Sequence, residues 1–244
     1  MELLIAMLVL LPLPAWVYAA RRAARRERRY ALWSATPTEV TDNPFRGYKI
    51  AQIVSGDRNA YLMGVLDVRY DVDDQAACLR SRCTPPGLDC VCGFYAFKNR
   101  SQAVELLHEL HVNRPQDLYG LLSADLDGEV LEYEHGFRAQ RQRIVRIELP
   151  QHCSQCPSHA GAPSEAMYLT HPQFRIDHLG TTRDVQSHSA LPKGFAPVRA
   201  LCQLHLPSEE MHILTLMDLR ARIGTEVALL PAEDQPPRRQ ESAA

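Results

Sequence analysis

Residues 120–149 have the sequence GLLSADLDGEVLEYEHGFRAQRQRIVRIEL. Two breaks divide this stretch, one at Asp127-Gly128 and the other at His135-Gly136. An Asp-Gly pair is typical of a turn, and strand-like segments joined by such breaks pair with their neighbours along the chain. The stretch therefore predicts a β meander.

Shorter segments before this stretch extend the β pattern. Residues 47–54 and 60–68 are rich in strand-forming residues, and residues 93–97 resemble another strand. A helix is expected over residues 102–111, with an apolar face formed by Ala103, Leu106, Leu107 and Leu110. We therefore expect an α+β fold whose first domain, residues 46–149, is rich in β structure.

Composition narrows the class of protein. The chain has 244 residues, of which 45% are hydrophobic, 23% are charged and 7% are aromatic. These values are typical of a globular protein and exclude collagen-like, mostly disordered and multi-span membrane chains. Residues 1–30 contain six arginines and two glutamates and so carry a net charge of +4. Because the whole chain has a net charge of −2, residues 31–244 carry −6. An acidic body makes nucleic acid an unlikely partner.

The N-terminal segment predicts a membrane anchor. Residues 3–20, LLIAMLVLLPLPAWVYAA, contain no charge, and a helix of this length nearly spans the hydrocarbon core of a bilayer. The run RRAARRERR follows directly and resists translocation. We expect residues 1–30 to be a single-pass anchor in the cell membrane, with the N-terminus outside, residues 3–29 in contact with lipid and the body in the cytoplasm. A cleaved signal peptide and a buried or interfacial helix are the alternatives.

The segments that flank the body have simpler patterns. Residues 31–45 are polar, contain two prolines and predict a linker. Residues 207–230 predict a C-terminal helix that Ser208 would open. Residues 231–244 have the composition of a disordered tail.

The sharper metal-binding pattern lies in residues 150–206. Cys153 and Cys156 form a C-x2-C pair, and Cys202 and His205 form a C-x2-H pair. A gap of two residues lets both ligands of a pair point at one ion, and four such ligands complete a tetrahedral zinc site. The spacing therefore predicts a closed structural Zn²⁺ site.

Such a site would make residues 150–206 a second, zinc-ribbon-like lobe, with strands at 166–170 and 174–179 between the two ligand pairs. Unbound cysteines and a redox dithiol formed by the C-x2-C pair are the alternatives. Other histidines of the segment are alternative ligands: His171, His178 and His188.

A weaker metal pattern precedes the strand at 93–97 and consists of four cysteines: Cys78, Cys83, Cys90 and Cys92. The Pro85-Pro86-Gly87 run favours a turn that would return Cys90 toward Cys83. These four ligands and the four above are enough for two four-coordinate zinc sites, with no cysteine left over. Disulfides are disfavoured in a reducing cytoplasm, so the competing explanation is simple packing of small buried cysteines.

Several motifs carry a resemblance to a known family. Residues 83–96, CTPPGLDCVCGFYA, are followed by Gly128-Glu129-Val130 and by HGFRA at residues 135–139. Over residues 46–206 the chain resembles an uncharacterised actinobacterial family that has H-x-x-P-x-x-x-C-x-C-G-[IF]-[YH]-A and G-[YFW]-R-A-E motifs, with a C-x2-C and a C-x2-H near the end in some members. The resemblance implies no activity. Cys83 stands where the family has His, an exchange that a metal ligand permits, and Gln140 replaces the family's Glu.

The rest of the chain offers no nucleophile–base pair and none of the common nucleotide-binding or hydrolase motifs. Arg138 is expected to pack its stem and to fix a backbone turn. We therefore expect a membrane-anchored cytoplasmic binding or adaptor module, stabilised by one or two structural zinc ions, that binds a protein partner and is not an enzyme. A metal-dependent enzyme at the inner membrane face and a nucleic-acid-binding zinc ribbon are the alternatives.

Overall fold

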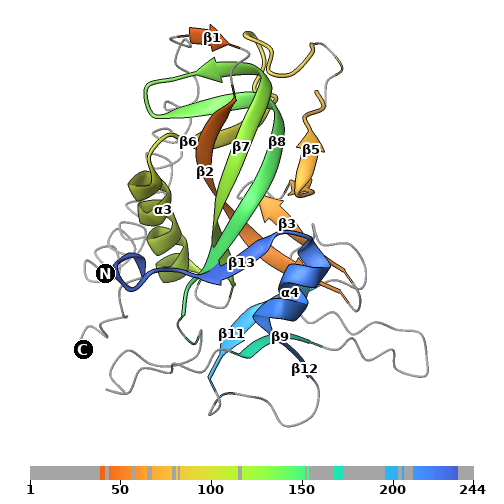
Figure 1. The fold of residues 1–244 in the computed structure, drawn as a ribbon, viewed down its shortest axis with the longest axis vertical. Helices are drawn as coiled ribbons and strands as arrows, with labels where there is room; N and C mark the ends of the chain where they lie inside the picture. Colours follow the sequence, from red (N-terminus) through yellow and green to blue (C-terminus); the bar gives the residue numbers. More distant parts are fainter. Residues whose placement is uncertain are drawn as a thin grey trace, which may run out of the picture.

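The computed structural model describes residues 39–41, 44–56, 59–64, 68–78, 81, 83–114, 117–151, 153, 168–172, 196–202, 205 and 211–235. Within these ranges, ten strands form one sheet and three form another, and two α-helices pack beside them (Figure 1). This part of the chain is therefore rich in β structure.

A long antiparallel hairpin forms the centre of the larger sheet. Strand β7 (Tyr119–Glu132) pairs with strand β8 (Gly136–Leu149) along nearly its whole length. The predicted meander is in fact this one hairpin, because the break at Asp127-Gly128 is an irregularity within β7 and the chain reverses only at residues 133–135. Gly128 has a φ of +70°, and an added Cβ would strike the Gln140 side chain, so glycine is needed where the strand bulges.

The second edge of β8 is covered by three short strands in succession. Strand β6 (Phe94–Phe97) pairs with the first residues of β8, and β5 (Asp73–Gln75) pairs with its middle. Strand β13 (Glu226–Leu229) runs parallel to the last four residues. Both edges of β8 are therefore hydrogen-bonded over most of its length.

Strand β2 (Phe45–Ser55) closes the sheet on itself. It pairs with β7 through residues 45–52 and meets β6 at the pair Tyr48–Phe97, so β2, β7, β8 and β6 form a ring of paired strands. The remaining short strands pair at its periphery: β1 (Glu39–Thr41) with β7, β3 (Ala60–Gly64) with β2, β4 (Arg69–Tyr70) with β3, and β10 (Ala196–Pro197) with β2.

Helix α3 (Arg100–Asn113) covers one face of the sheet. Its buried residues are Ala103, Val104, Leu107 and Leu110, and they pack against Ile50, Tyr119 and Leu121. The predicted helix is confirmed, with two more residues at each end, and Leu106 of the predicted face is only partly buried. A hydrogen-bonded ion pair from Arg100 to Glu148 (2.9 Å) and a second to Asp234 fasten the helix to β8 and to the 3-10 helix η2 (Ala232–Asp234).

The smaller sheet has the order β11 (Arg199–Leu201), β9 (Tyr168–Pro172) and β12 (Met211–Leu214). Strand β9 matches one of the two strands predicted between the ligand pairs, and the other, residues 174–179, lies outside the described residues. Leu169 and Leu214 belong to the same buried cluster as Ile53 and Leu122 of the large sheet, so the two sheets share one apolar core.

The predicted helix over residues 207–230 is wrong in its extent. Residues 211–214 are a strand, and helix α4 spans only Leu216–Ile223. A capping box between Thr215 and Asp218 begins the helix, and Gly224, with a φ of +85°, ends it. Residues 226–229 then pair with β8, because that strand edge offers hydrogen bonds that a longer helix would leave unmade.

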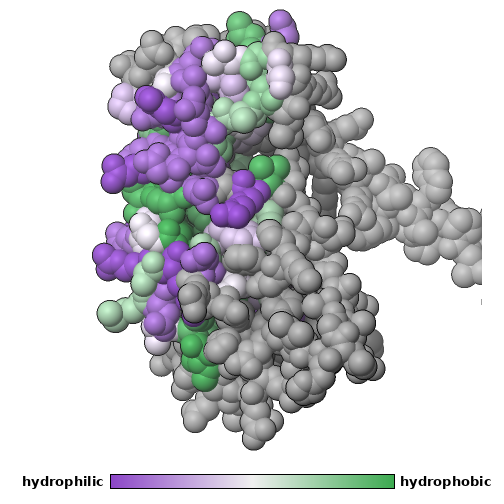
Figure 2. All heavy atoms as spheres, turned by 90° about the vertical axis from the view of Figure 1, so that its right-hand side faces the viewer, coloured by the Kyte–Doolittle hydropathy of each residue, from purple (hydrophilic) through white to green (hydrophobic). Residues whose placement is uncertain are grey.

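The predicted fold class is also wrong in its membrane component. The described residues are β-rich, and none of their helices is long and apolar enough to cross a membrane. The predicted span at residues 3–20, its arginine flank and residues 236–244 of the predicted tail lie outside the described residues. The prediction of a disordered tail is wrong for residues 232–234, which form the 3-10 helix η2 and pair with Arg100 through Asp234. Part of the predicted linker, residues 39–41, is strand β1. Figure 2 shows the side of the molecule that includes β5 and α4, where hydrophilic residues cover most of the described area.

Lys49 is one of the charged side chains that are buried in the large sheet. Lys49 of β2 is 8% exposed, donates a hydrogen bond to Oε1 of Gln142 on β8 and lies 5.0 Å from the centre of the Phe94 ring. Burial lowers the pKa of Lys49 to about 7, and nearby Asp74 opposes that shift only in part. Because an unfolded chain keeps this lysine protonated up to about pH 10.4, Lys49 destabilises the fold most at and below pH 7 and less as the pH rises.

The double variant Lys49→Met/Gln142→Leu should therefore be more stable than the wild type at pH 7, because it replaces a buried polar pair by apolar groups. Its advantage should shrink by on the order of 1 kcal/mol per pH unit between pH 7 and 9. Urea unfolding of both proteins across this range measures the effect. Parallel pH profiles for the two proteins would show that Lys49 keeps an ordinary pKa.

Candidate metal centres

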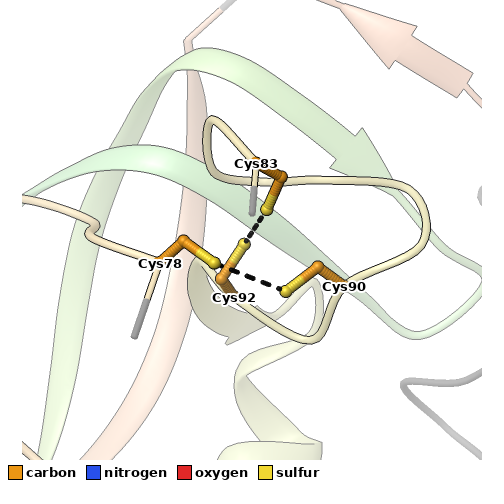
Figure 3. A group of neighbouring side chains, drawn as sticks. All are labelled: Cys78, Cys83, Cys90 and Cys92. Atoms are coloured by element: carbon orange, nitrogen blue, oxygen red, sulfur yellow. Dashed lines mark hydrogen bonds between the residues drawn. The ribbon is translucent and has the colours of Figure 1, made fainter. Parts of the chain in front are cut away.

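The first metal centre brings together the four cysteines between β5 and β6 (Figure 3). Their sulfur atoms all lie within 4.8 Å of one another, although the residues span fifteen positions of the chain. The sulfur of Cys83 lies 3.2 Å from that of Cys92, and the sulfur of Cys78 lies 3.8 Å from that of Cys90. The four cysteines form no disulfide and are half-buried. The weaker of the two sequence patterns therefore forms a complete group of four possible ligands.

Two backbone turns and one glycine shape the loop that carries these cysteines. The amide of Ser81 donates to the carbonyl of Cys78 (2.9 Å), and the amide of Cys90 donates to the carbonyl of Gly87 (3.1 Å). A Cβ on Gly87 would lie 2.7 Å from the Cys83 sulfur, so only glycine leaves room for that thiol. The predicted turn at residues 85–87 thus returns the chain as expected and brings Cys90 near Cys83.

Arg138 connects this loop to the large sheet. Its side chain is 3% exposed, and its guanidinium donates hydrogen bonds to the carbonyls of Gly87 (2.8 Å) and Cys90. The rings of Tyr95 and Tyr133 lie 5.9 and 5.7 Å from the guanidinium carbon. The expectation that Arg138 fixes a backbone turn is confirmed, but its position beside a metal centre was not evident from the sequence.

The crowding of four thiols affects their protonation. Contact with the Cys92 thiol is the main cause that raises the pKa of Cys83, followed by burial and by the Cys78 and Cys90 thiols. A negative charge on one sulfur is unfavourable beside three others unless a cation shares the space. The same arrangement that opposes ionisation in the metal-free protein therefore favours a bound metal ion.

The second centre gathers three of the four predicted ligands: Cys153, Cys202 and His205. The Nδ1 atom of His205 lies 3.2 Å from the Cys202 sulfur and 3.5 Å from the Cys153 sulfur. Cys153 follows the end of β8 and Cys202 follows β11, and a backbone hydrogen bond from His205 to Cys202 (3.0 Å) forms the turn between the last two ligands. Cys156 lies outside the described residues.

Of the three alternative histidine ligands, one lies in a described strand. His171 lies in β9, paired in register with His212 of β12, while His178 and His188 lie outside the described residues. Both cysteines of the centre are buried, at 6% and 4% exposure, whereas those of the first centre are half-buried. The two centres therefore differ in how accessible their sulfur atoms are.

Comparison with family models, with curated proteins and with solved structures finds no match to this chain. The resemblance to an actinobacterial family thus stays a prediction. What the fold and its sites define is a β-rich protein with two groups of side chains that could hold a metal ion.

Replacing Arg138 by Gln should destabilise the protein and loosen the first centre, because two carbonyls lose a buried charged donor. Each lost hydrogen bond of this kind costs about 1–3 kcal/mol. Arg141→Gln on the same strand is the matched control, since its side chain is 55% exposed and forms an ion pair with Asp127, which is itself half exposed. Thermal unfolding and metal titration of both variants are the measurements. Equal behaviour of the two variants would contradict this role of Arg138.

Proposed function

We propose that the chain is a non-enzymatic binding module whose β-rich body is held by structural zinc. The observation that carries this proposal is the group of four sulfurs at Cys78, Cys83, Cys90 and Cys92. Zn–S bonds of about 2.3 Å at tetrahedral angles separate two sulfurs by about 3.8 Å. The distances of 3.2 and 3.8 Å within the group are close to that value.

Zinc is the metal that this donor set favours. Thiolates are soft ligands, and tetrahedral groups of four cysteines are typical of zinc or of iron–sulfur clusters. The short spacing of the four sulfurs fits one ion better than a cluster, in which sulfide and several irons separate the thiolates. Four protein ligands occupy every coordination position of a tetrahedral zinc ion. No position then remains for a substrate, so the role of the metal is to stabilise the fold.

The second group supports the same proposal. A zinc ion with ordinary bond lengths places a sulfur and an imidazole nitrogen about 3.6 Å apart, close to the 3.5 and 3.2 Å found around His205. Cys156, three residues after Cys153, is our proposed fourth ligand. With it the ion would tie the end of β8 to the end of β11, and so fasten the small sheet to the hairpin.

A binding role is supported by two exposed apolar side chains on the loop of the first centre. Leu88 and Val91 lie between its ligands and are 63% and 71% exposed. A hydrogen bond from the Tyr95 hydroxyl to the Val91 carbonyl (2.8 Å) adds to the two from Arg138 in holding this part of the loop. Apolar side chains on a pre-organised loop lose little entropy when a protein surface covers them. We therefore infer that the loop contacts a protein partner.

The metal can be tested by exchange of one ligand. Cys83→Ser should lose the zinc of the first centre and lower the melting temperature by several degrees, because serine is a poor zinc ligand. Cys83→His should retain most of the zinc, and Thr84→Ala, an exposed residue of the same loop, is the control. Zinc content and thermal unfolding are measured for all three variants. Identical zinc content in the Ser variant and the wild type would refute the first centre.

The partner can be tested by changing the loop surface alone. Leu88→Ser/Val91→Ser should keep zinc and the melting temperature and lose the protein contacts that the wild type makes in its own cells. Met217→Ser, an equally exposed apolar position on α4, is the control. Quantitative cross-linking of the three proteins gives the comparison. An unchanged set of cross-linked proteins in the loop variant would refute a binding role of the loop.

A metal-dependent enzyme is the second candidate, and one observation favours it. Among the described residues, the second centre has three ligands of the Cys2His type, and three protein ligands with an open position are typical of catalytic zinc. If Cys156 is the fourth ligand, Cys156→Ala should weaken zinc binding at this centre by a factor of 100 or more, estimated as ~3 kcal/mol of lost ligation. Unchanged zinc affinity in Cys156→Ala would favour the open, catalytic site.

A further inference from the structure

The four sulfurs of the first centre form two facing pairs. Figure 3 shows Cys83 pointing at Cys92 and Cys78 pointing at Cys90, with sulfur separations of 3.2 and 3.8 Å. A disulfide bond has a length of about 2.05 Å. Small movements of the side chains would therefore bring either pair to bonding distance, without a change in the path of the loop.

We propose that this centre is an oxidation site for hydrogen peroxide, at which bound zinc is replaced by the disulfides Cys83–Cys92 and Cys78–Cys90. This inference rests on the zinc site proposed above. It goes further because it assigns the same four residues a second, covalent state.

The chemistry balances with peroxide as the oxidant. One thiolate of a pair attacks a peroxide oxygen, which breaks the O–O bond and gives a sulfenic acid and hydroxide. The second thiolate attacks that sulfur, forms the S–S bond and releases a second hydroxide. The two pairs together consume two peroxides and give up four electrons. Zinc leaves because its four thiolate ligands are gone.

The specificity of the pairing comes from the loop around the sulfurs. The hydrogen bonds of Arg138 to the Gly87 and Cys90 carbonyls do not involve the metal, so they hold the loop when zinc leaves. The Cys83 sulfur lies in the space that a side chain at residue 87 would fill, so the position of this thiol depends on Gly87. We therefore expect the two facing pairs to form in preference to the other two pairings, which are Cys78–Cys83 with Cys90–Cys92 and Cys78–Cys92 with Cys83–Cys90.

The cysteines of the first centre are more exposed than those of the second, so we expect peroxide to oxidise the first centre earlier. The four cysteines here are half-buried, whereas Cys153 and Cys202 are 6% and 4% exposed. Oxidation of cysteine follows the access of the oxidant to the sulfur. Under limiting peroxide the first centre should release its zinc while the second retains its own.

The test treats the full, zinc-loaded chain with increasing hydrogen peroxide and follows zinc release with a chromogenic chelator. Trypsin cuts after Arg80 and Arg82, and cleavage before Asp89 separates Cys83 from Cys90 and Cys92. Fragmentation of the linked peptides at Val91 in the mass spectrometer then distinguishes a link to Cys90 from a link to Cys92. The expected result is loss of the first centre's zinc together with the Cys83–Cys92 and Cys78–Cys90 links, and restoration of zinc binding by a dithiol reductant. Other links, sulfinic or sulfonic acids at these cysteines, or earlier oxidation of Cys153 and Cys202 would overturn the proposal.

Two controls separate this proposal from the zinc site on which it rests. Arg138→Gln should give a mixture of disulfide pairings, whereas Arg141→Gln should give the same two disulfides as the wild type. If exposure of the cysteines alone decided the pairing, the two variants would give the same result. A reduced, metal-free sample is oxidised in parallel. If the chain does not bind zinc at the first centre, the proposed function is refuted. If the metal-free sample also fails to form the two facing disulfides, the proposed oxidation site is refuted as well.

Discussion

The hydrogen bonding along both edges of β8 is the constraint on which the rest of the structure depends. Strand β7 takes one edge, and β6, β5 and β13 share the other. Strands of three or four residues are too short to be stable alone, so each exists because β8 offers it a paired edge. The loop that carries the first metal centre joins two of these short strands, β5 and β6. Its ends are therefore positioned by the same strand that carries Arg138.

The same strand relates the two metal centres in space. Arg138, which holds the first centre, and Leu149, just before Cys153 of the second, are separated by eleven steps of extended chain, roughly 36 Å at 3.3 Å per residue. A metal ion at the first centre would fasten the loop between β5 and β6, and one at the second would fasten the chain that leaves the end of β8. The apolar core between them, which includes Ile144 and Ile147, stabilises the middle of the strand. Bound metal ions and the apolar core would thus stabilise different parts of β8.

Local patterns in the sequence predicted helix α3, several strands, the four cysteines of the first group and three of the four residues proposed for the second. They failed where pairing between distant segments decided the outcome. Asp127-Gly128 has the composition of a turn, but partners on both sides of β7 keep the strand continuous, and the pair becomes a bulge. Residues 226–229 have helix-compatible composition, but an open edge 80 residues earlier in the chain makes them a strand. The sequence predicts that Arg138 fixes a backbone turn but not which turn, because nothing near it in the sequence shows that the loop at residues 87–90 lies beside it.

The parallel pairing of β13 with β8 also affects how the protein is made. Residues 146–149 leave the ribosome some 80 residues before their partners at 226–229. Synthesis proceeds at about 5–20 residues per second, so this edge of the hairpin stays uncovered for several seconds. Uncovered strand edges are templates for pairing with other chains. The interval before β13 arrives is thus the stage of biosynthesis at which association with chaperones, or with a second nascent copy, competes with completion of the fold.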